Sequence, residues 1–357
     1  MSVHRISLFI AAAIALAAVT PTHAQGLKQV GTIAIPGEPI NQLGVMTIDQ
    51  TTGLGYLAEK DNKAVDVFDT KTNKYVSHIA GFVGQTKNGD ASGPNGVVVV
   101  NDGAELWVSD GDSTIKIIDL KAGKITAMLA TGGKLRANAM AYDPKDRIVI
   151  VANSNDEPPF LGLISTEPGH KILAKIPVAE SAENLERSSF HATSGMFYTA
   201  IPVLRADPTK GILAQTDAKA GKLVKLHELP GCHPHSLQIV SDSTIFLGCS
   251  SAHGANSKPG GDLAVFDIAT GTITARGAGL GGNGSSALNP KLGQYYHATT
   301  AATLMVVDMK TAKPVQKIPT SPGARSIDAS SANNHVYLAT IAKGGPCGGC
   351  IQVYAPE

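Results

Sequence analysis

A ten-residue segment, VDVFDTKTNK at 65–74, recurs along the chain in recognisable copies. The clearest copies are IKIIDLKAGK at 115–124, LAVFDIATGT at 263–272 and LMVVDMKTAK at 304–313. Each copy has an apolar, β-branched run, then an aspartate, then a short polar turn. Aspartate suits the first position of a type I turn because its side chain accepts hydrogen bonds from the amides that follow. Each copy therefore predicts a β-hairpin.

The spacing of these hairpins predicts the fold. The turn aspartates and their equivalents in weaker copies are Asp69, Asp119, Ser165, Asp217, Asp267, Asp308 and Ala355. Their mean spacing is about 48 residues, which is the length of one four-stranded propeller blade. Seven such units account for residues 25–357, so we predict an all-β, seven-bladed β-propeller as a single domain. The alternatives are a β-helix, which has a much shorter period, and a two-sheet sandwich.

The two ends of the chain are predicted to complete one blade together. An apolar run, a polar turn and an aromatic-rich run precede each turn aspartate, and we assign them to the two inner strands of a blade. The last copy ends at Glu357 after its third strand. The segment LKQVGTIAIP at 27–36 is similar to the segments that follow the turn aspartates. We therefore expect the N-terminal strand to be the outer strand of the last blade and to close the ring.

The first 24 residues have the pattern of a secretory signal peptide. Arg5 precedes a short apolar stretch at 6–19, and a small-residue cleavage site follows at 22–24. The stretch is too short to span a membrane, and no later segment is long enough. We expect a periplasmic or secreted protein. The net charge is only +1 and no basic block is present, so a nucleic-acid partner is not expected.

Four cysteines are expected to form two disulfides. Cys232 and Cys249 fall at the same end of two adjacent inner strands, so an oxidising compartment favours a bond between them. Cys347 and Cys350 have CxxC spacing, which in a loop predicts a local disulfide. The alternatives are a metal site that uses these thiols with His235, and a zinc site formed by all four cysteines.

Three strand segments connect the chain to a known family. They are LWVSD at 106–110, IVAN at 150–153 and VYLAT at 336–340. They stand where YVTN-type repeats have their namesake strand, and the chain resembles the YncE-like periplasmic propellers over essentially all of its predicted mature length. The resemblance implies the fold and the compartment. It implies no single activity, because propellers host many.

The repeats also place polar residues near the start of each innermost strand. Long loops crowd the same face, so we predict that this channel mouth is the binding site. The residues aligned there are Gln42, Asn95, Ala137 or Asn138, Glu183 or Asn184, His235, Asn283, and Ala324 or Arg325. We predict ligand contacts from Gln42, Asn95, Asn138 and Arg325, and Arg325 favours an anionic ligand because its planar fork matches a carboxylate. The alternative is a channel that holds only water.

A second functional hypothesis is an enzyme. The segment GPNGVVVVNDGAELWVSD at 93–110 resembles a stretch of gluconolactonase-like propellers. That resemblance implies Asn95 as a ligand of a central divalent cation such as Ca, Mg, Mn or Zn. Gln42 and Leu43 occupy the region where that family has a glutamate, so Glu183 is the candidate second ligand. In a metal-dependent lactone hydrolase or lyase of this kind, His235 or Glu183 would move the proton.

The alternative to the enzyme is the binding propeller described above, which has no catalytic activity. Its expected partner is a small molecule or a periplasmic protein at the channel mouth, and we expect the chain to be a monomer. A bound divalent metal would favour the enzyme over this binding protein.

Overall fold

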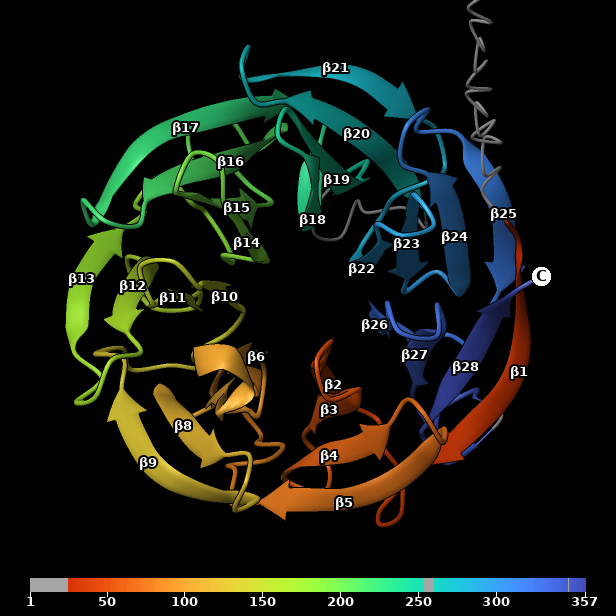
Figure 1. The fold of residues 1–357 in the computed structure, drawn as a ribbon. Coiled ribbons are helices and arrows are strands. Elements are labelled where there is room, and N and C mark those ends of the chain that lie inside the picture. The colour runs from red at the N-terminus through yellow and green to blue at the C-terminus, as the bar shows by residue number, and fades with distance from the viewer. Residues whose placement is uncertain (1–24, 253–259, 346) are drawn as a thin grey trace, which may run out of the picture.

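The computed structural model describes residues 25–252, 260–345 and 347–357, and the predicted signal peptide at 1–24 lies outside the described residues. Seven four-stranded antiparallel sheets form a ring around a central channel (Figure 1). The predicted seven-bladed β-propeller is therefore confirmed. Two short 3₁₀ helices, η1 (Gly89–Ala91) and η2 (Asn101–Gly103), belong to blade 2 and the loop that leads into it.

The blades are numbered along the chain, and each is given from its innermost to its outermost strand. Blade 1 is β2 (Leu43–Ile48), β3 (Leu54–Glu59), β4 (Ala64–Asp69) and β5 (Lys74–Ala80); blade 2 is β6 (Val97–Val100), β7 (Glu105–Ser109), β8 (Thr114–Asp119) and β9 (Lys124–Ala130). Blade 3 is β10 (Met140–Asp143), β11 (Ile148–Asn153), β12 (Phe160–Ser165) and β13 (Ile172–Pro177); blade 4 is β14 (Ser188–His191), β15 (Met196–Ile201), β16 (Lys210–Asp217) and β17 (Lys222–Pro230). Blade 5 is β18 (His233–Ser241), β19 (Thr244–Ser250), β20 (Gly261–Asp267) and β21 (Thr272–Gly277); blade 6 is β22 (Gly284–Asn289), β23 (Gln294–Thr299), β24 (Thr303–Asp308) and β25 (Pro314–Pro319). Blade 7 is β26 (Ser326–Ala329), β27 (Val336–Thr340), β28 (Cys350–Pro356) and β1 (Leu27–Ala34).

The N-terminal strand closes the ring as predicted. Strand β1 pairs antiparallel with β28, from Leu27 opposite Pro356 to Ala34 opposite Cys350. Leu27 is buried against blade 6, where the side chain of Gln316 accepts a hydrogen bond from the Leu27 amide at 2.7 Å. The first and last strands of the chain thus share one blade, and β1 covers the edge that β28 would otherwise leave unpaired.

The predicted turn chemistry is present in the hairpins that join the third and fourth strands. Asp69 accepts a hydrogen bond from the Lys71 amide at 2.7 Å, and Asp308 accepts one from the Thr311 amide at the same distance. Asn73 and Ala312 have positive φ in these turns. The aspartate fixes the turn and thereby the register of the two outer strands.

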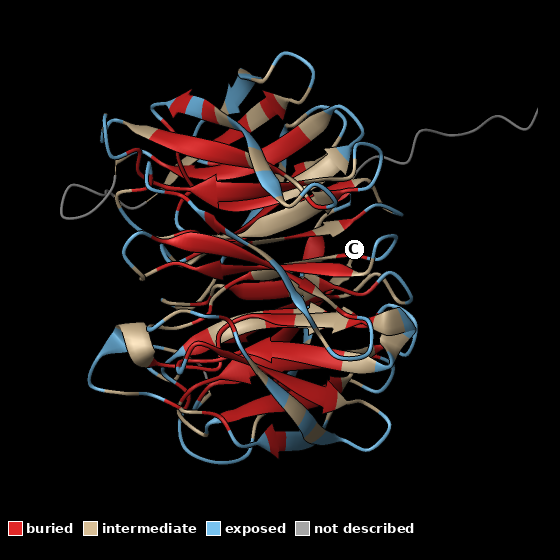
Figure 2. Ribbon diagram, turned by 90° about the vertical axis from the view of Figure 1, so that its left-hand side faces the viewer, coloured by how far each residue is buried: buried red, intermediate tan, exposed pale blue. Residues whose placement is uncertain are grey.

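The apolar core lies between neighbouring blades. Tyr56 and Val67 of blade 1, for example, pack with Leu106 and Ile118 of blade 2. The middle strands are almost wholly buried, whereas the outermost strands are largely exposed (Figure 2). This packing holds the seven innermost strands rigidly around the channel.

Both predicted disulfides are present. Cys232, at the entry to blade 5, is bonded to Cys249 in β19, and their Cα atoms lie 4.9 Å apart. Cys347 is bonded to Cys350 at the start of β28. The thiols are therefore not available as the metal ligands of the alternative hypotheses. In the part of the chain that is described, no helix has the length and apolar character needed to traverse a membrane.

Candidate functional site

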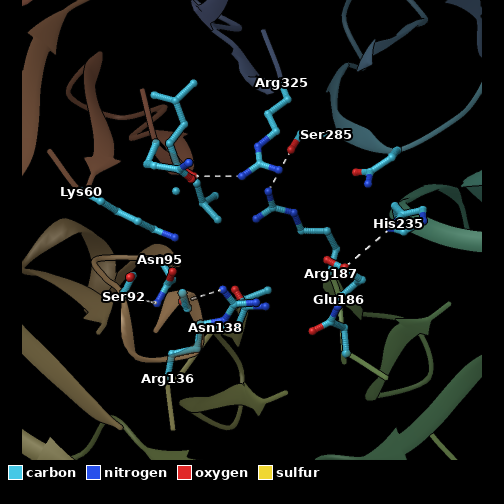
Figure 3. A pocket seen from close by; sticks show the side chains of 18 of the residues that line it. Lys60, Ser92, Asn95, Arg136, Asn138, Glu186, Arg187, His235, Ser285 and Arg325 are labelled. Carbon is cyan, nitrogen blue, oxygen red and sulfur yellow. Dashed lines mark hydrogen bonds and ion pairs between the residues drawn. The ribbon is translucent and has the colours of Figure 1, made fainter. Parts of the chain in front are cut away.

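A polar cavity occupies the end of the channel where the innermost strands begin (Figure 3). Its volume is about 400 Å³, which is within the range of small-molecule sites. Its polar lining consists of Gln42, Lys60, Gln85, Ser92, Asn95, Arg136, Asn138, Asn184, Glu186, Arg187, His235, Asn283, Ser285 and Arg325. Side chains from widely separated parts of the sequence thus meet at one place.

Most of the residues predicted to surround the channel mouth line this cavity. Gln42, Asn95, Asn138, His235 and Arg325 are all part of the lining. Of the two residues predicted for blade 4, Asn184 lines the cavity and Glu183 does not, and Glu186 and Arg187 line it as well.

The difference in blade 4 has a simple geometric origin. Asn95 and Asn138 each stand two residues before an innermost strand, β6 and β10. Strand β14 begins at Ser188, so the equivalent residue of blade 4 is Glu186. Alignment of the repeats predicts Glu183 or Asn184 at this position, which is two or three residues too early. The adjacent charges of Glu186 and Arg187, directly before a β-rich run, were the signal that could have identified them.

Four cations dominate the charge of the cavity. Lys60 follows β3, Arg136 lies in the loop before β10, Arg187 precedes β14 and Arg325 precedes β26, so they come from four different parts of the ring. Figure 3 shows the guanidinium groups of Arg187 and Arg325 close to each other near the centre of the view. Lys60 lies at the left and Arg136 at the lower left. Glu186 is the one carboxylate among the lining residues.

Short contacts with the walls of the channel position the arginines. Arg187 donates from Nη2 to Ser285 Oγ of blade 6 at 2.8 Å, and Arg325 donates from Nη2 to the Leu43 carbonyl of blade 1 at 3.4 Å. Each contact uses one of the five N–H donors of a guanidinium. The remaining donors are therefore available to a ligand or to water in the cavity.

Burial makes these positive charges unfavourable in the absence of a counter-ion. It lowers the pKa of Lys60 to about 8, with further lowering from the nearby charges of Arg136 and Arg325. It lowers the pKa of Arg187 to about 10, and Arg325, which repels Arg187, has a pKa lowered mainly by its own burial. An anion bound between these groups would relieve the repulsion.

The carboxylate of Glu186 is held by His235. Glu186 Oε1 lies 3.6 Å from His235 Nδ1, across the boundary between blades 4 and 5. Burial alone would raise the pKa of Glu186, but the hydrogen bond and charge of His235, together with Arg187 and Arg325, lower it. Glu186 is therefore ionised at neutral pH, and the four cations exceed it in charge.

Asn95 has a structural role in addition to its place in the lining. Its Nδ2 donates to the Ser92 carbonyl at 2.9 Å and to the Ala137 carbonyl at 3.0 Å, and its own carbonyl accepts from the Val45 amide at 2.6 Å. It thereby joins the entries to blades 1, 2 and 3. Among the described residues, no group of three or more His, Cys, Asp and Glu side chains could hold a metal ion. The metal role of Asn95 and Glu183 stays a prediction.

Comparison with known proteins supports the fold and indicates no function. No family model matches the chain, and no curated protein does. Among solved structures, the chain is similar to the hydrazine synthase of Kuenenia stuttgartiensis, with a TM-score of 0.71 and 14% sequence identity. The match covers 89% of this chain and 96% of that one. At this identity the likeness shows a shared fold alone.

Proposed function

We propose that the protein is an exported binding propeller that takes a small anionic molecule at its channel mouth. The observation that carries this proposal is the charge of the cavity, in which four cations face the single carboxylate of Glu186. The two disulfides support export, because such bonds persist in oxidising compartments such as the periplasm.

The geometry of the cations suits a compact anion. They approach the cavity from separate blades, so a ligand at its centre would contact several of them at once. Arginine recognises carboxylate and phosphate through paired N–H groups, and the low-dielectric walls strengthen each such contact. The propeller scaffold holds these side chains in place before the ligand arrives, which reduces the entropy lost on binding.

The same charge disfavours the alternative with a divalent cation. Lys60, Arg136, Arg187 and Arg325 would all repel a metal ion placed between them. The lactone hydrolase or lyase hypothesis rests on Asn95 and Glu183, and Glu183 does not line the cavity. We therefore favour binding of an anion over metal-dependent catalysis.

The test is binding of citrate, hexanoate and inorganic phosphate, measured by calorimetry at constant ionic strength. We expect at least one of them to bind wild-type protein, and Arg325→Gln to weaken that binding by about tenfold or more. Arg147→Gln is the matched control, because Arg147 lies at a hairpin turn, where it pairs with Glu167 at 3.3 Å. Absence of binding for all three anions, or an equal loss in both variants, would overturn the proposal.

A further inference from the structure

A second cavity continues the channel beyond the mouth. Its volume is about 210 Å³, and it shares Val45, Arg187 and Ser285 with the cavity at the mouth. The shared residues show that the two spaces are neighbours along the channel. The chemistry of the second cavity differs, because its lining is composed mainly of serine and apolar side chains and includes the carboxylate of Asp328.

Asp328 is a half-buried acid that has no cationic partner among the described residues. Its carboxylate accepts hydrogen bonds from the Ile48 amide at 2.7 Å and from the Ala329 amide at 2.8 Å. No lysine, arginine or histidine forms an ion pair with it in the described part of the chain. Burial raises its pKa to about 6 despite the two amide donors, so it is mostly ionised above neutral pH.

A hydroxyl group on the same face of β26 as this carboxylate also lacks a partner. Ser326 stands two residues before Asp328, so both side chains lie on one face of the strand. Ser326 is 1% exposed, its Oγ has no hydrogen-bond partner among the described residues, and it lines the second cavity. A buried hydroxyl without a partner is costly, so the site is suited to a polar group that enters from outside the protein.

The channel therefore has opposite charge at its two levels. Arg325 immediately precedes β26, and Asp328 is the third residue of that strand. At the rise of an extended strand, their Cα atoms are about 10 Å apart. Arg187 lies at the boundary, but its guanidinium is bonded to Ser285 and interacts with Glu186 and Arg325 of the mouth.

We propose that the ligand is zwitterionic, with an anionic group at the mouth and an ammonium group against Asp328 and Ser326. This inference rests on the proposed anion site and adds the chemistry of the ligand's other end. The N–H groups of an ammonium match the carboxylate of Asp328 and the unpartnered hydroxyl oxygen of Ser326. A second carboxylate at this level would be repelled by Asp328.

The test compares 6-aminohexanoate, hexanoate and adipate, which have the same chain length and differ only at one end. Calorimetry at about pH 7.5 keeps Asp328 ionised and the amine protonated. We expect 6-aminohexanoate to bind wild-type protein about tenfold more tightly than hexanoate, and more tightly than adipate. Asp328→Asn should remove this preference without weakening hexanoate binding.

A second variant allows the proposal to be tested even if Asp328→Asn does not fold. Ser326→Ala deletes a hydroxyl that has no partner among the described residues, so it should not lower stability and should weaken 6-aminohexanoate binding alone. Asp146→Asn, at an exposed turn, is the matched control and should behave as wild type.

The outcomes separate this inference from the function on which it rests. Three results would overturn the zwitterion and leave the anion site intact. They are hexanoate binding with no gain in affinity from the amine, tighter binding of adipate than of 6-aminohexanoate, and a preference for 6-aminohexanoate that survives both Asp328→Asn and Ser326→Ala. If none of the three compounds binds, and citrate and phosphate also fail, both proposals are wrong.

Discussion

Glu186 Oε1 lies 3.6 Å from His235 Nδ1, and the contact crosses the boundary between blades 4 and 5. Glu186 therefore has a hydrogen-bonding partner in addition to the nearby charges of Arg187 and Arg325, which also lower its pKa. Among the described residues neither arginine forms an ion pair with Glu186, so both keep donors for a ligand. Both residues line the cavity at the channel mouth, and Figure 3 shows the contact between Glu186 and His235.

The first prediction concerns the charge of this mouth. Glu186→Gln removes the only carboxylate of the lining, so citrate should bind about three- to tenfold more tightly than to wild type. Titration calorimetry at constant ionic strength measures the change. Glu157→Gln is the control, because Glu157 is an exposed acid that pairs with Arg205 at 3.4 Å. Unchanged or weaker citrate binding in Glu186→Gln would contradict a site governed by positive charge.

The second prediction concerns metal dependence. We expect treatment with a chelator to leave both the melting temperature and citrate binding of purified protein unchanged, since the mouth carries an excess of positive charge. Elemental analysis and thermal melts before and after chelation measure this. A stoichiometric divalent metal that is lost in Asn95→Ala and in Glu183→Gln would instead support the hydrolase or lyase hypothesis.

The third prediction concerns ring closure. Deletion of residues 26–37 removes β1, which exposes the edge of β28 and uncovers the side chains that Leu27 and Ile33 bury. We expect insoluble protein, or protein without a cooperative thermal transition. The control is a chain that begins at residue 25, which should melt cooperatively. A deletion variant that melts near the temperature of this control would show that closure by β1 is dispensable.

The fold was predictable because it repeats. The turn aspartates mark a register that recurs in five of the seven blades, and the split last blade followed from the similarity of 27–36 to the other outer strands. Asp69 and Asp308 accept the turn hydrogen bonds that the sequence pattern indicates. The Cys232–Cys249 bond was predictable for the same reason, since the inner hairpin places the two residues side by side, whereas the Cys347–Cys350 bond follows from CxxC spacing alone.

The site was predictable only in part because it varies between blades. Asn95, Asn138, His235 and Arg325 were found by alignment of the copies. Blade 4 has a weak copy, and a shift of three residues exchanged Glu186 for Glu183. Lys60 and Arg136 lie in loops that no repeat position marks, so only the three-dimensional arrangement shows that they share one cavity. Charge complementarity of this kind depends on side chains brought together by the ring.

The last prediction concerns a buried acidic pair in blade 1. Asp66 in β4 is 2% exposed and Glu59 at the end of β3 is fully buried. Burial, followed by the charge of Glu59, raises the pKa of Asp66 to about 8, and burial raises the pKa of Glu59 to about 7. In the unfolded chain both acids titrate near their ordinary values of about 4. Between about pH 4 and about pH 8, the folded state therefore binds more protons than the unfolded state.

Stability therefore falls as pH rises. The contribution of these acids to stability is fully present at low pH and is lost as pH rises through about 7 to 8, at up to about 1.4 kcal/mol per pH unit for each group. We expect the free energy of unfolding, measured with urea, to fall between about pH 5 and about pH 8. Asp66→Asn should reduce that fall and make the protein more stable than wild type at the higher pH, because it removes the cost of ionising a buried acid. Asp146→Asn, at an exposed turn, should follow the wild-type curve, and an Asp66→Asn curve parallel to wild type would show that the pair does not govern the alkaline loss of stability.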